Sequence, residues 1–344
     1  MQKIKVGILG ATGSVGQRFI ELLQNHPWFE ISAVAASEKS IGKSYREAVN
    51  WLMSTPLPEH IGRMIVQPCT PTLPCEWVFS ALDSSVAGEI ESAFAKAGYV
   101  VHSNARNHRM SSDVPLLVPE VNAEHLELLT RQSFGNGKII TNPNCSTIGL
   151  TLALKPLQDH FGIEAVHVVT MQAVSGAGYP GVSSLDILDN VIPLIRGEEE
   201  KLETETLKIL GRMHNGQVEH ERFKVSAHCN RVAVHDGHLE CVSIKLKKRA
   251  KREELISAWR NFRGKPQELA LPLAPLKPIH YFEEEHFPQP KLHRNVDKGM
   301  AVCIGRLREC ALFDYKFVLL SHNTIRGAAG GAILNAELQK SLFV

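Results

Sequence analysis

The stretch IKVGILGATGSVGQRFIELLQNHP, residues 4–27, decides the fold. An apolar, β-leaning run from Ile4 to Leu9 leads into a glycine-rich turn, which continues into a segment with helical periodicity. A dinucleotide-binding fingerprint requires this order of strand, turn and helix, because glycines let a pyrophosphate approach the backbone at the helix N-terminus. The alternative is a tight strand-to-helix turn without a ligand. We expect cofactor contacts from the turn residues Gly10, Thr12, Gly13, Ser14, Val15 and Gly16.

Strand-like and helical segments continue to alternate up to residue 144, which predicts a doubly wound parallel sheet of the Rossmann type. The expected strands after the first are Glu30–Ala35, Trp77–Asp83, Tyr99–Ser103 and Lys138–Thr141. None of the five tyrosines has a lysine four residues later, so the chain lacks the Tyr-x-x-x-Lys pair of the short-chain dehydrogenases.

The second half of the chain predicts an α+β domain with a mixed sheet. Its strand-like segments are Ala165–Val174, Leu239–Leu246, Met300–Leu307 and Tyr315–Leu320, and helical stretches such as Ile256–Phe262 lie between them. The last helix is rich in glycine and alanine, which suits close packing, and we expect it to return to the nucleotide-binding domain. The predicted division is therefore 1–144 plus 324–344 for cofactor binding, and 145–323 for catalysis and dimerisation.

The residues after the second strand favour NADP over NAD. An acidic residue there would bind the ribose 2′-OH of NAD, but the chain has Ala35-Ala36-Ser37 instead. Ser37, Ser40 and Lys43 offer hydroxyl groups and a cation to a 2′-phosphate. Ser80, at the end of a later strand, is a further expected cofactor contact. The alternative is a polar loop with incidental charge.

A second informative stretch is KIITNPNCSTIGLTLAL, residues 138–154. A short strand, the turn Asn142-Pro143-Asn144 and a periodic apolar segment place a helix start at or just after Cys145. The unpaired N–H groups and the helix dipole there favour a thiolate, and the N–H groups can also stabilise an oxyanion on a carbonyl that the sulfur attacks. Cys145 is therefore a candidate nucleophile, although most free cysteines are buried structural residues.

Composition narrows the function classes. The net charge of +2 and the absence of a membrane-length apolar run exclude nucleic acid or a membrane as the main partner. Seven scattered cysteines fit a reducing compartment, and we expect a cytoplasmic protein. No Cys/His cluster has zinc spacing, so no structural metal is expected.

Six motifs in register resemble the aspartate-β-semialdehyde dehydrogenase family, in its archaeal and fungal branch, over nearly the whole chain. They are GATGSVG, NPNCST, QAVSGAG from Gln172, ETLK from Glu205 to Lys208, Arg231 with His238 seven residues later, and HNTIRGAAGG. The resemblance implies NADP-dependent, reversible conversion of aspartyl phosphate to aspartate semialdehyde through a cysteine thioester. This reaction serves the biosynthesis of lysine, methionine, threonine and isoleucine.

The resemblance also implies roles for individual residues. Cys145 is the nucleophile, and His238 is the general acid/base, an imidazole that titrates near neutrality. Arg231 grips the substrate α-carboxylate and Glu205 its ammonium group, although the charged segment around Glu205 could also be a solvated helix face. Lys208 and Arg109 bind phosphate, with Arg106 close enough to be confused with Arg109; Gln172 and Asn144 line the site, and Asn323 lies near the nicotinamide carboxamide.

Several alternatives remain at this point. Malonyl-CoA reductase shares the scaffold, the thiol, the histidine and NADP, but its substrate has no ammonium group for Glu205 to bind. Glyceraldehyde-3-phosphate dehydrogenase and N-acetylglutamyl-phosphate reductase share the scaffold with other motifs. A non-catalytic NADP sensor would have a decayed site. The resemblance further implies a homodimer or homotetramer, with small-molecule substrate and phosphate as its other partners.

Overall fold

A computed structural model describes residues 2–343, and this part of the chain divides into two compact units. The first unit comprises residues up to 117, residues 124–142 and residues from 328 onward; the second comprises 118–123 and 143–327. Each unit is built around one six-stranded sheet.

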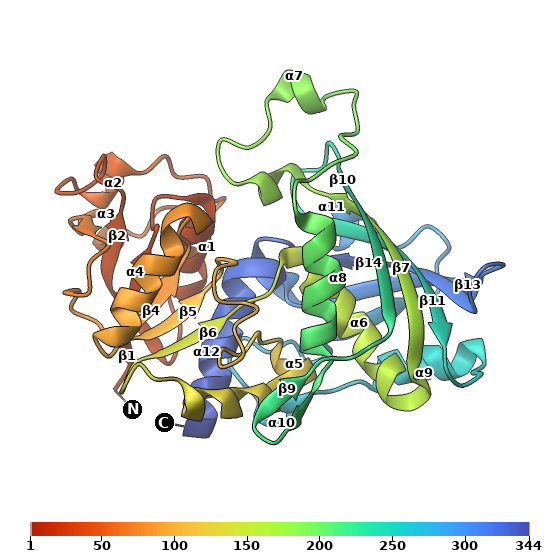
Figure 1. Cartoon of the computed structure of the whole chain (residues 1–344). Helices are drawn as coiled ribbons and strands as arrows, with labels where there is room; N and C mark the ends of the chain where they lie inside the picture. The colour runs from red at the N-terminus through yellow and green to blue at the C-terminus, as the bar shows by residue number, and fades with distance from the viewer. Residues whose placement is uncertain (1, 344) are drawn as a thin grey trace. The chain divides into compact units, whose positions relative to one another are not determined.

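The first unit contains a fully parallel sheet in the order β3-β2-β1-β4-β5-β6, of which β1, β2, β4, β5 and β6 are labelled in Figure 1. Its strands are β1 (Ile4–Leu9), β2 (Phe29–Ala36), β3 (Gln67–Pro68), β4 (Trp77–Ser80), β5 (Val100–Ser103) and β6 (Lys138–Thr141). The reversal of strand order around β1 is the topology of a doubly wound sheet. The predicted fold class is therefore confirmed for this unit.

Apolar side chains explain why these strands are central. β4 is buried along its whole length and β1 at every position except Lys5, as expected for parallel strands covered on both faces. α1 (Ser14–Leu23) packs on β1 and β2, and α4 (Ser84–Lys96) on β5 and β6. Leu9, Val78 and Phe94 belong to the core between them.

The glycine- and alanine-rich C-terminal helix is α12 (Gly330–Phe343), and it packs in the first unit against β5 and α1. Its fully buried Glu337 contacts Nε2 of His26 at 2.7 Å, and Asn335 donates to Asn142. Small residues at the start of the helix permit this close packing, as the sequence predicts.

The second unit contains a mixed sheet in the order β10-β7-β11-β14-β13-β12. Its strands are β7 (Ile163–Gln172), β10 (Lys224–Arg231), β11 (His238–Leu246), β12 (Ile279–Phe282), β13 (Val302–Glu309) and β14 (Tyr315–Ser321). The long helices are α6 (Cys145–Phe161), which packs on four of these strands, α8 (Glu198–Ile209), which packs on β10, and α9 (Arg252–Asn261), which packs on β12.

The register of the second sheet brings polar residues to the end of three adjacent strands. Arg231 on β10 lies opposite Gln172 on β7, and His238 on β11 lies opposite Ser321 on β14. Leu239 pairs with Met171 in the antiparallel ladder of β11 and β7. The neighbouring residues His238 and Gln172 therefore lie at the same end of that ladder. Side chains on strands alternate between faces, and all three functional candidates are on the buried face.

The remaining elements are short. They are α2 (Tyr45–Ala48), α3 (Glu59–Gly62), α5 (Pro119–Asn122), α7 (Ser184–Ile187), α10 (Lys265–Glu268), α11 (Pro290–His293), the two-stranded sheet of β8 (Arg212–His214) and β9 (Gln217–Glu219), the 3₁₀ segments η1 (Ala123–Arg131), η2 (Val174–Ala177) and η3 (Val296–Gly299), and the π-helix η4 (Ile325–Ala329). Within residues 2–343, no helix combines the length and apolar character needed to cross a bilayer.

Candidate active site

Helix α6 begins at Cys145, as the sequence predicts, and Asn144 is its N-cap. The Oδ1 atom of Asn144 accepts hydrogen bonds from the backbone N–H groups of Ser146 (3.0 Å) and Thr147 (3.3 Å). The first turn contains no acidic residue, so the positive end of the helix dipole acts on the thiol without a competing carboxylate in that turn. This arrangement favours the thiolate form of Cys145.

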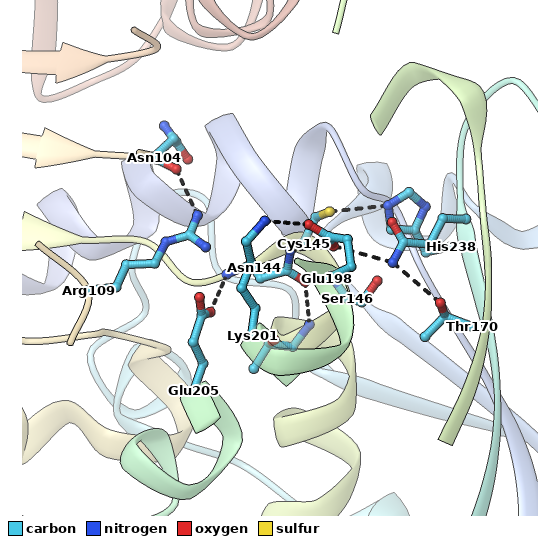
Figure 2. Close-up of polar contacts among 12 residues, drawn as sticks. Asn104, Arg109, Asn144, Cys145, Ser146, Thr170, Glu198, Lys201, Glu205 and His238 are labelled. Carbon is cyan, nitrogen blue, oxygen red and sulfur yellow. Dashed lines mark hydrogen bonds and ion pairs between the residues drawn. The ribbon is translucent and has the colours of Figure 1, made fainter. Parts of the chain in front are cut away.

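Two glutamates of α8 hold the turn that carries the thiol. Glu205 accepts a hydrogen bond from the backbone N–H of Asn144 at 2.7 Å, and Glu198 accepts one from its side-chain Nδ2 atom, also at 2.7 Å (Figure 2). These residues are seven apart and therefore on one face of the helix. With the capping bonds, the backbone and both side-chain amide atoms of Asn144 are fixed.

Cys145 and His238 form a thiol–imidazole contact: Sγ lies 3.1 Å from Nε2 (Figure 2). The other ring nitrogen, Nδ1, accepts a hydrogen bond from the backbone N–H of Ala173 at 3.1 Å. An acceptor nitrogen carries no proton, so the proton of the neutral ring is on Nε2 and faces the sulfur. His238 is thus a hydrogen-bond donor to Cys145.

The protonation of His238 differs from the sequence-based expectation. Burial and, to a smaller extent, the positive charge of Arg231 lower the pKa of His238 to about 3. The imidazole does not titrate near neutrality in this form of the protein, so that expectation was wrong. The cause of the lowered pKa is the complete burial of His238, because a charged imidazolium would lose its hydration there.

Arg231 lies beside this pair. Its Nη1 atom donates to the carbonyl oxygen of Ala173 at 2.8 Å. Burial lowers the pKa of Arg231, while the negative charges of Cys145 and Glu198 act in the opposite direction. A Cβ atom at Gly176 would lie 2.8 Å from Nη1 of Arg231 and 3.1 Å from Cε1 of His238, so a glycine at 176 leaves room for both side chains.

Gln172 and Glu198 complete the centre of this cluster. The Nε2 atom of Gln172 lies 3.3 Å from Oγ1 of Thr170 and 3.4 Å from Oε2 of Glu198, and Lys201 contacts Oε1 of Glu198 at 2.6 Å. Burial alone would raise the pKa of Glu198, but Lys201 and the amide donors outweigh it and lower the pKa. Glu198 is an ionised carboxylate that the sequence analysis missed; the sequence offered only its seven-residue spacing from Glu205.

The acidic helix α8 is not a solvated charged face. Glu199 accepts from the backbone N–H of Cys229 at 3.1 Å, and Glu203 accepts from that of Ala227 at 3.0 Å. Both N–H groups belong to β10, an edge strand of the sheet. Glu205 and Lys208 are buried on the helix, and both keep the substrate roles expected of them as predictions.

Asn323 joins two loops of the second unit. Its Oδ1 atom accepts from the backbone N–H of Gly237, and its Nδ2 atom donates to Oγ of Ser175, both at 2.8 Å. The turn before His238 is thereby tied to the segment after Gln172. The nicotinamide contact expected of Asn323 stays a prediction.

The π-helix η4 packs directly against Cys145. A Cβ atom at Gly327 would lie 2.8 Å from Cβ of Cys145, so only glycine fits there without displacement. The preceding residue, Arg326, donates from Nη1 to Oε1 of Glu120 at 2.9 Å in a buried, two-pronged ion pair. π-turns are often found at functional sites, and this one sets the position of Cys145.

The first unit fits a dinucleotide at its glycine turn. Gly10 has a φ of +74°, and a Cβ atom there would lie 2.6 Å from the carbonyl oxygen of Ala81. At Gly16 a Cβ atom would lie 2.3 Å from the carbonyl oxygen of Gly10. Gly13 caps α1 with no side-chain hydrogen bond, which leaves the helix N-terminus open to an anion. These observations fit a pyrophosphate on the backbone.

The other expected contacts of the first unit are placed as follows. Ser37 and Lys43 are exposed after β2, whereas Ser40 is buried and its N–H donates to the carbonyl of Ser37. Ser80 is fully buried at the end of β4. Arg109 is buried and donates to the carbonyl of Asn104 at 2.8 Å (Figure 2), whereas Arg106 is exposed.

Two residues that the sequence analysis missed support the glycine turn. The hydroxyl of buried Tyr45 donates to the carbonyl of Ala11 at 2.7 Å, and Nε2 of Gln17 donates to that of Thr12 at 2.9 Å. Tyr45 is far from Ala11 in the sequence, so no local sequence pattern indicates this hydrogen bond. Gln17 was visible only as a polar residue of the helical segment.

Two family models match the chain. The model described as "Semialdehyde dehydrogenase, NAD binding domain" matches residues 5–129, and that described as "Semialdehyde dehydrogenase, dimerisation domain" matches residues 154–326. The two matches cover most of the first and second halves of the sequence in the expected order.

Individual relatives agree with these matches. The chain is 51% identical to the aspartate-semialdehyde dehydrogenase of Methanothermobacter thermautotrophicus, over 97% of this chain and 98% of that protein. It is 50% identical to that of Schizosaccharomyces pombe, over 97% of both chains. The crystal structure of aspartate semialdehyde dehydrogenase with NADP from Candida albicans superposes with a TM-score of 0.92 at 46% identity, and the match covers 98% of this chain and 99% of that one.

Proposed function

This chain belongs to the aspartate-semialdehyde dehydrogenase family, and from that premise we propose the reaction it catalyses. It reduces L-aspartyl 4-phosphate to L-aspartate 4-semialdehyde with NADPH and releases inorganic phosphate, and it also runs in reverse. The observation that carries this function is the contact of 3.1 Å between Sγ of Cys145 and Nε2 of His238 at the start of α6. The reaction belongs to the biosynthesis of lysine, methionine, threonine and isoleucine.

The cofactor is NADP, and the glycine turn between β1 and α1 would hold its pyrophosphate. When bound, NADP⁺ supplies a nicotinamide that accepts a hydride from the adduct, and NADPH returns it in biosynthesis. Ser37, Ser40 and Lys43 would face the 2′-phosphate, and the residue directly after β2 is Ser37 instead of an acidic residue. Ser80 and Asn323 are proposed as further contacts of the cofactor.

In the oxidative direction the thiolate of Cys145 attacks the aldehyde carbon of the substrate and forms a C–S bond. The carbonyl oxygen becomes an oxyanion, to which the proton on Nε2 of His238 and the first N–H groups of α6 can donate. Oxidation of this adduct leaves a thioester on Cys145. Phosphate then attacks the thioester carbon, the C–S bond breaks, and aspartyl phosphate leaves while the thiolate is restored.

The remaining site residues bind and orient the substrate. Arg231 grips the α-carboxylate with donors that Ala173 does not use, and Glu205 takes the ammonium group. Lys208 and Arg109 bind the phosphate. Gln172 and Asn144 each present a side-chain amide to the acyl carbon or the adduct oxygen.

Malonyl-CoA reductase is not favoured as an alternative. The full-length relatives at about half identity are aspartate-semialdehyde dehydrogenases. The thioester substrate of a malonyl-CoA reductase also has no ammonium group, whereas the buried glutamates of α8 present carboxylates beside Asn144.

We also propose that the chain assembles with itself and works in the cytoplasm. The match to a dimerisation-domain model over residues 154–326 supports a homodimer or homotetramer. The seven cysteines are all free thiols, which fits a reducing compartment. Light scattering after size-exclusion chromatography distinguishes dimer from tetramer, and a monomer would refute the assembly.

The experiment that tests the function follows NADPH formation by the full chain with aspartate semialdehyde and phosphate. We expect turnover that depends on both compounds and that stops when phosphate is withheld. A parallel assay supplies malonyl-CoA with NADPH, where we expect none. Turnover of malonyl-CoA with no activity on aspartate semialdehyde would refute the proposal.

A further inference from the structure

The carboxylate of Glu198 is the meeting point of two side-chain amides at the centre of the site. Its Oε2 atom accepts from Nδ2 of Asn144 at 2.7 Å and lies 3.4 Å from Nε2 of Gln172. Asn144 comes from the turn before α6 and Gln172 from the end of β7, so one oxygen atom links two elements that carry candidate site residues.

Glu198 accepts from one N–H of each amide, which leaves the second N–H of Asn144, whereas Nε2 of Gln172 also donates to Oγ1 of Thr170 at 3.3 Å. A side-chain NH₂ group offers two donors in a plane, so fixing one of them sets the direction of the other. Both nitrogens lie around the same oxygen, and the rest of Asn144 is held by the capping bonds to Ser146 and Thr147 and by Glu205. The second N–H of Asn144 and the side-chain carbonyl of Gln172 are therefore oriented before any substrate is bound.

Glu198 is ionised, which is the charge state needed to hold two amide NH₂ groups. Lys201 contacts its other carboxylate oxygen at 2.6 Å, and the side chain of Glu198 is only 10% exposed. Buried anions persist when they are paired and hydrogen-bonded. As an ionised carboxylate Glu198 can only accept hydrogen bonds, so it holds the NH₂ group, and not the carbonyl, of each amide toward itself.

We propose that Glu198 is a positioning residue, which acts through Asn144 to aim its second amide N–H at the oxygen atoms of the acyl group or phosphate and holds the amide of Gln172 in place beside it. The inference rests on the proposed function for its kinetic consequences, although the geometry it describes does not. Glu198 itself touches neither the reacting carbon nor the thiol in this account.

The test compares three variants of the full chain. Glu198→Ala removes both acceptors, and Glu198→Gln keeps one carbonyl oxygen to accept from an amide. Glu200→Gln is the matched control, because Glu200 lies on the same helix, carries the same charge and is exposed. The measurements are kcat and KM for aspartate semialdehyde at saturating NADP and phosphate, and the rate of Cys145 alkylation by iodoacetamide.

We expect Glu198→Ala to lower kcat about 100-fold, the order seen when an oriented oxyanion donor is lost, with KM changed less than about 3-fold. Glu198→Gln should lose less than about 10-fold, and Glu200→Gln should match the unmodified chain. Alkylation forms no oxyanion, so its rate should change less than about 3-fold in all variants. A kcat of Glu198→Ala within about 3-fold of the unmodified chain would overturn the proposal, as would an equal loss in alkylation.

A crystal structure of the same variants separates this inference from the proposed function. In Glu198→Ala the amides of Asn144 and Gln172 should leave the positions they hold around Oε2. If both amides stay in place, Glu198 does not position them, whatever the activity. If the unmodified chain shows no turnover of aspartate semialdehyde while the amides do move, the proposed function fails and the positioning role stands. Should Glu198→Ala not fold, the crystal structure of Glu198→Gln decides the question. The amide of Asn144 or of Gln172 that loses its acceptor should then be rotated.

Discussion

Replacing Arg231 by lysine tests the substrate-binding role of this site most quantitatively. Arg231 is 6% exposed, and its Nη1 atom donates to the carbonyl oxygen of Ala173 at 2.8 Å. Its other donors can form a two-pronged contact with a carboxylate. Lysine keeps the charge but carries it on a single ammonium group. It therefore cannot bind the carbonyl of Ala173 and at the same time form two parallel hydrogen bonds to a carboxylate.

The expected loss follows from one charge-assisted hydrogen bond. Such a bond contributes about 1.5–3 kcal/mol, which corresponds to a fall of about 10- to 150-fold in kcat/KM for aspartate semialdehyde. Most of the loss should be in KM, because the α-carboxylate is present in both the bound substrate and the transition state. The assay is the initial rate of NADPH formation across substrate concentrations.

A substrate without the α-carboxylate isolates the interaction. With propanal the unmodified chain and Arg231→Lys should differ less than about 3-fold, because the missing group cannot contact Arg231. Arg222→Lys serves as the control variant, since the Arg222 side chain is 87% exposed on the surface. An equal loss on both aldehydes, or an unchanged KM for aspartate semialdehyde, would remove Arg231 from the carboxylate role.

Three further predictions follow from the packing, the buried imidazole and the cofactor loop. Gly176→Ala should lower kcat/KM at least about 10-fold with the fold retained, because the new Cβ would lie 2.8 Å from Arg231 and 3.1 Å from His238. Full activity would show that these two side chains can move aside without loss of function. His238 has a folded-state pKa of about 3, below its unfolded value of 6.5, so stability falls as pH drops from 6.5 toward 3. Reversible urea unfolding should show that His238→Asn removes about 2 kcal/mol of the loss between pH 7 and pH 5, with His60→Asn, at an exposed histidine, as the control variant. Lys43→Ala should raise KM for NADP about 10-fold with KM for NAD unchanged, and equal effects on both would reject the 2′-phosphate contact.

Local sequence was enough to predict the strand, turn and helix at the start of the first unit and the position of Cys145 at the start of a helix. The first strand, the glycine turn and the following helix all appear where residues 4–27 predict them, because each depends on neighbours in the chain. Cys145 at the start of α6 follows from Asn144 as an N-cap and from the apolar periodicity after it. His238 came from a motif resemblance, and its contact with Cys145 could be known only from the structure.

The parts that sequence did not reveal depend on tertiary contacts. Glu198, Glu199, Glu203 and Glu205 stand in one acidic run, yet two bind the Asn144 turn and two bind the backbone of β10. Nothing local distinguishes them from a solvated helix face. The protonation of His238 likewise follows from complete burial and from the backbone N–H of Ala173, which lies on another element.

Trapping the covalent intermediate tests the central claim most directly. The full chain is mixed with NADP and aspartate semialdehyde without phosphate, quenched in acid within one turnover, and digested for mass spectrometry. We predict an aspartyl group in thioester linkage on the peptide that contains Cys145, removed when phosphate is added before the quench, and absent from Cys145→Ser, which should still bind NADP. Turnover by Cys145→Ser, or an acyl group on a different residue, would contradict catalysis through this thiol.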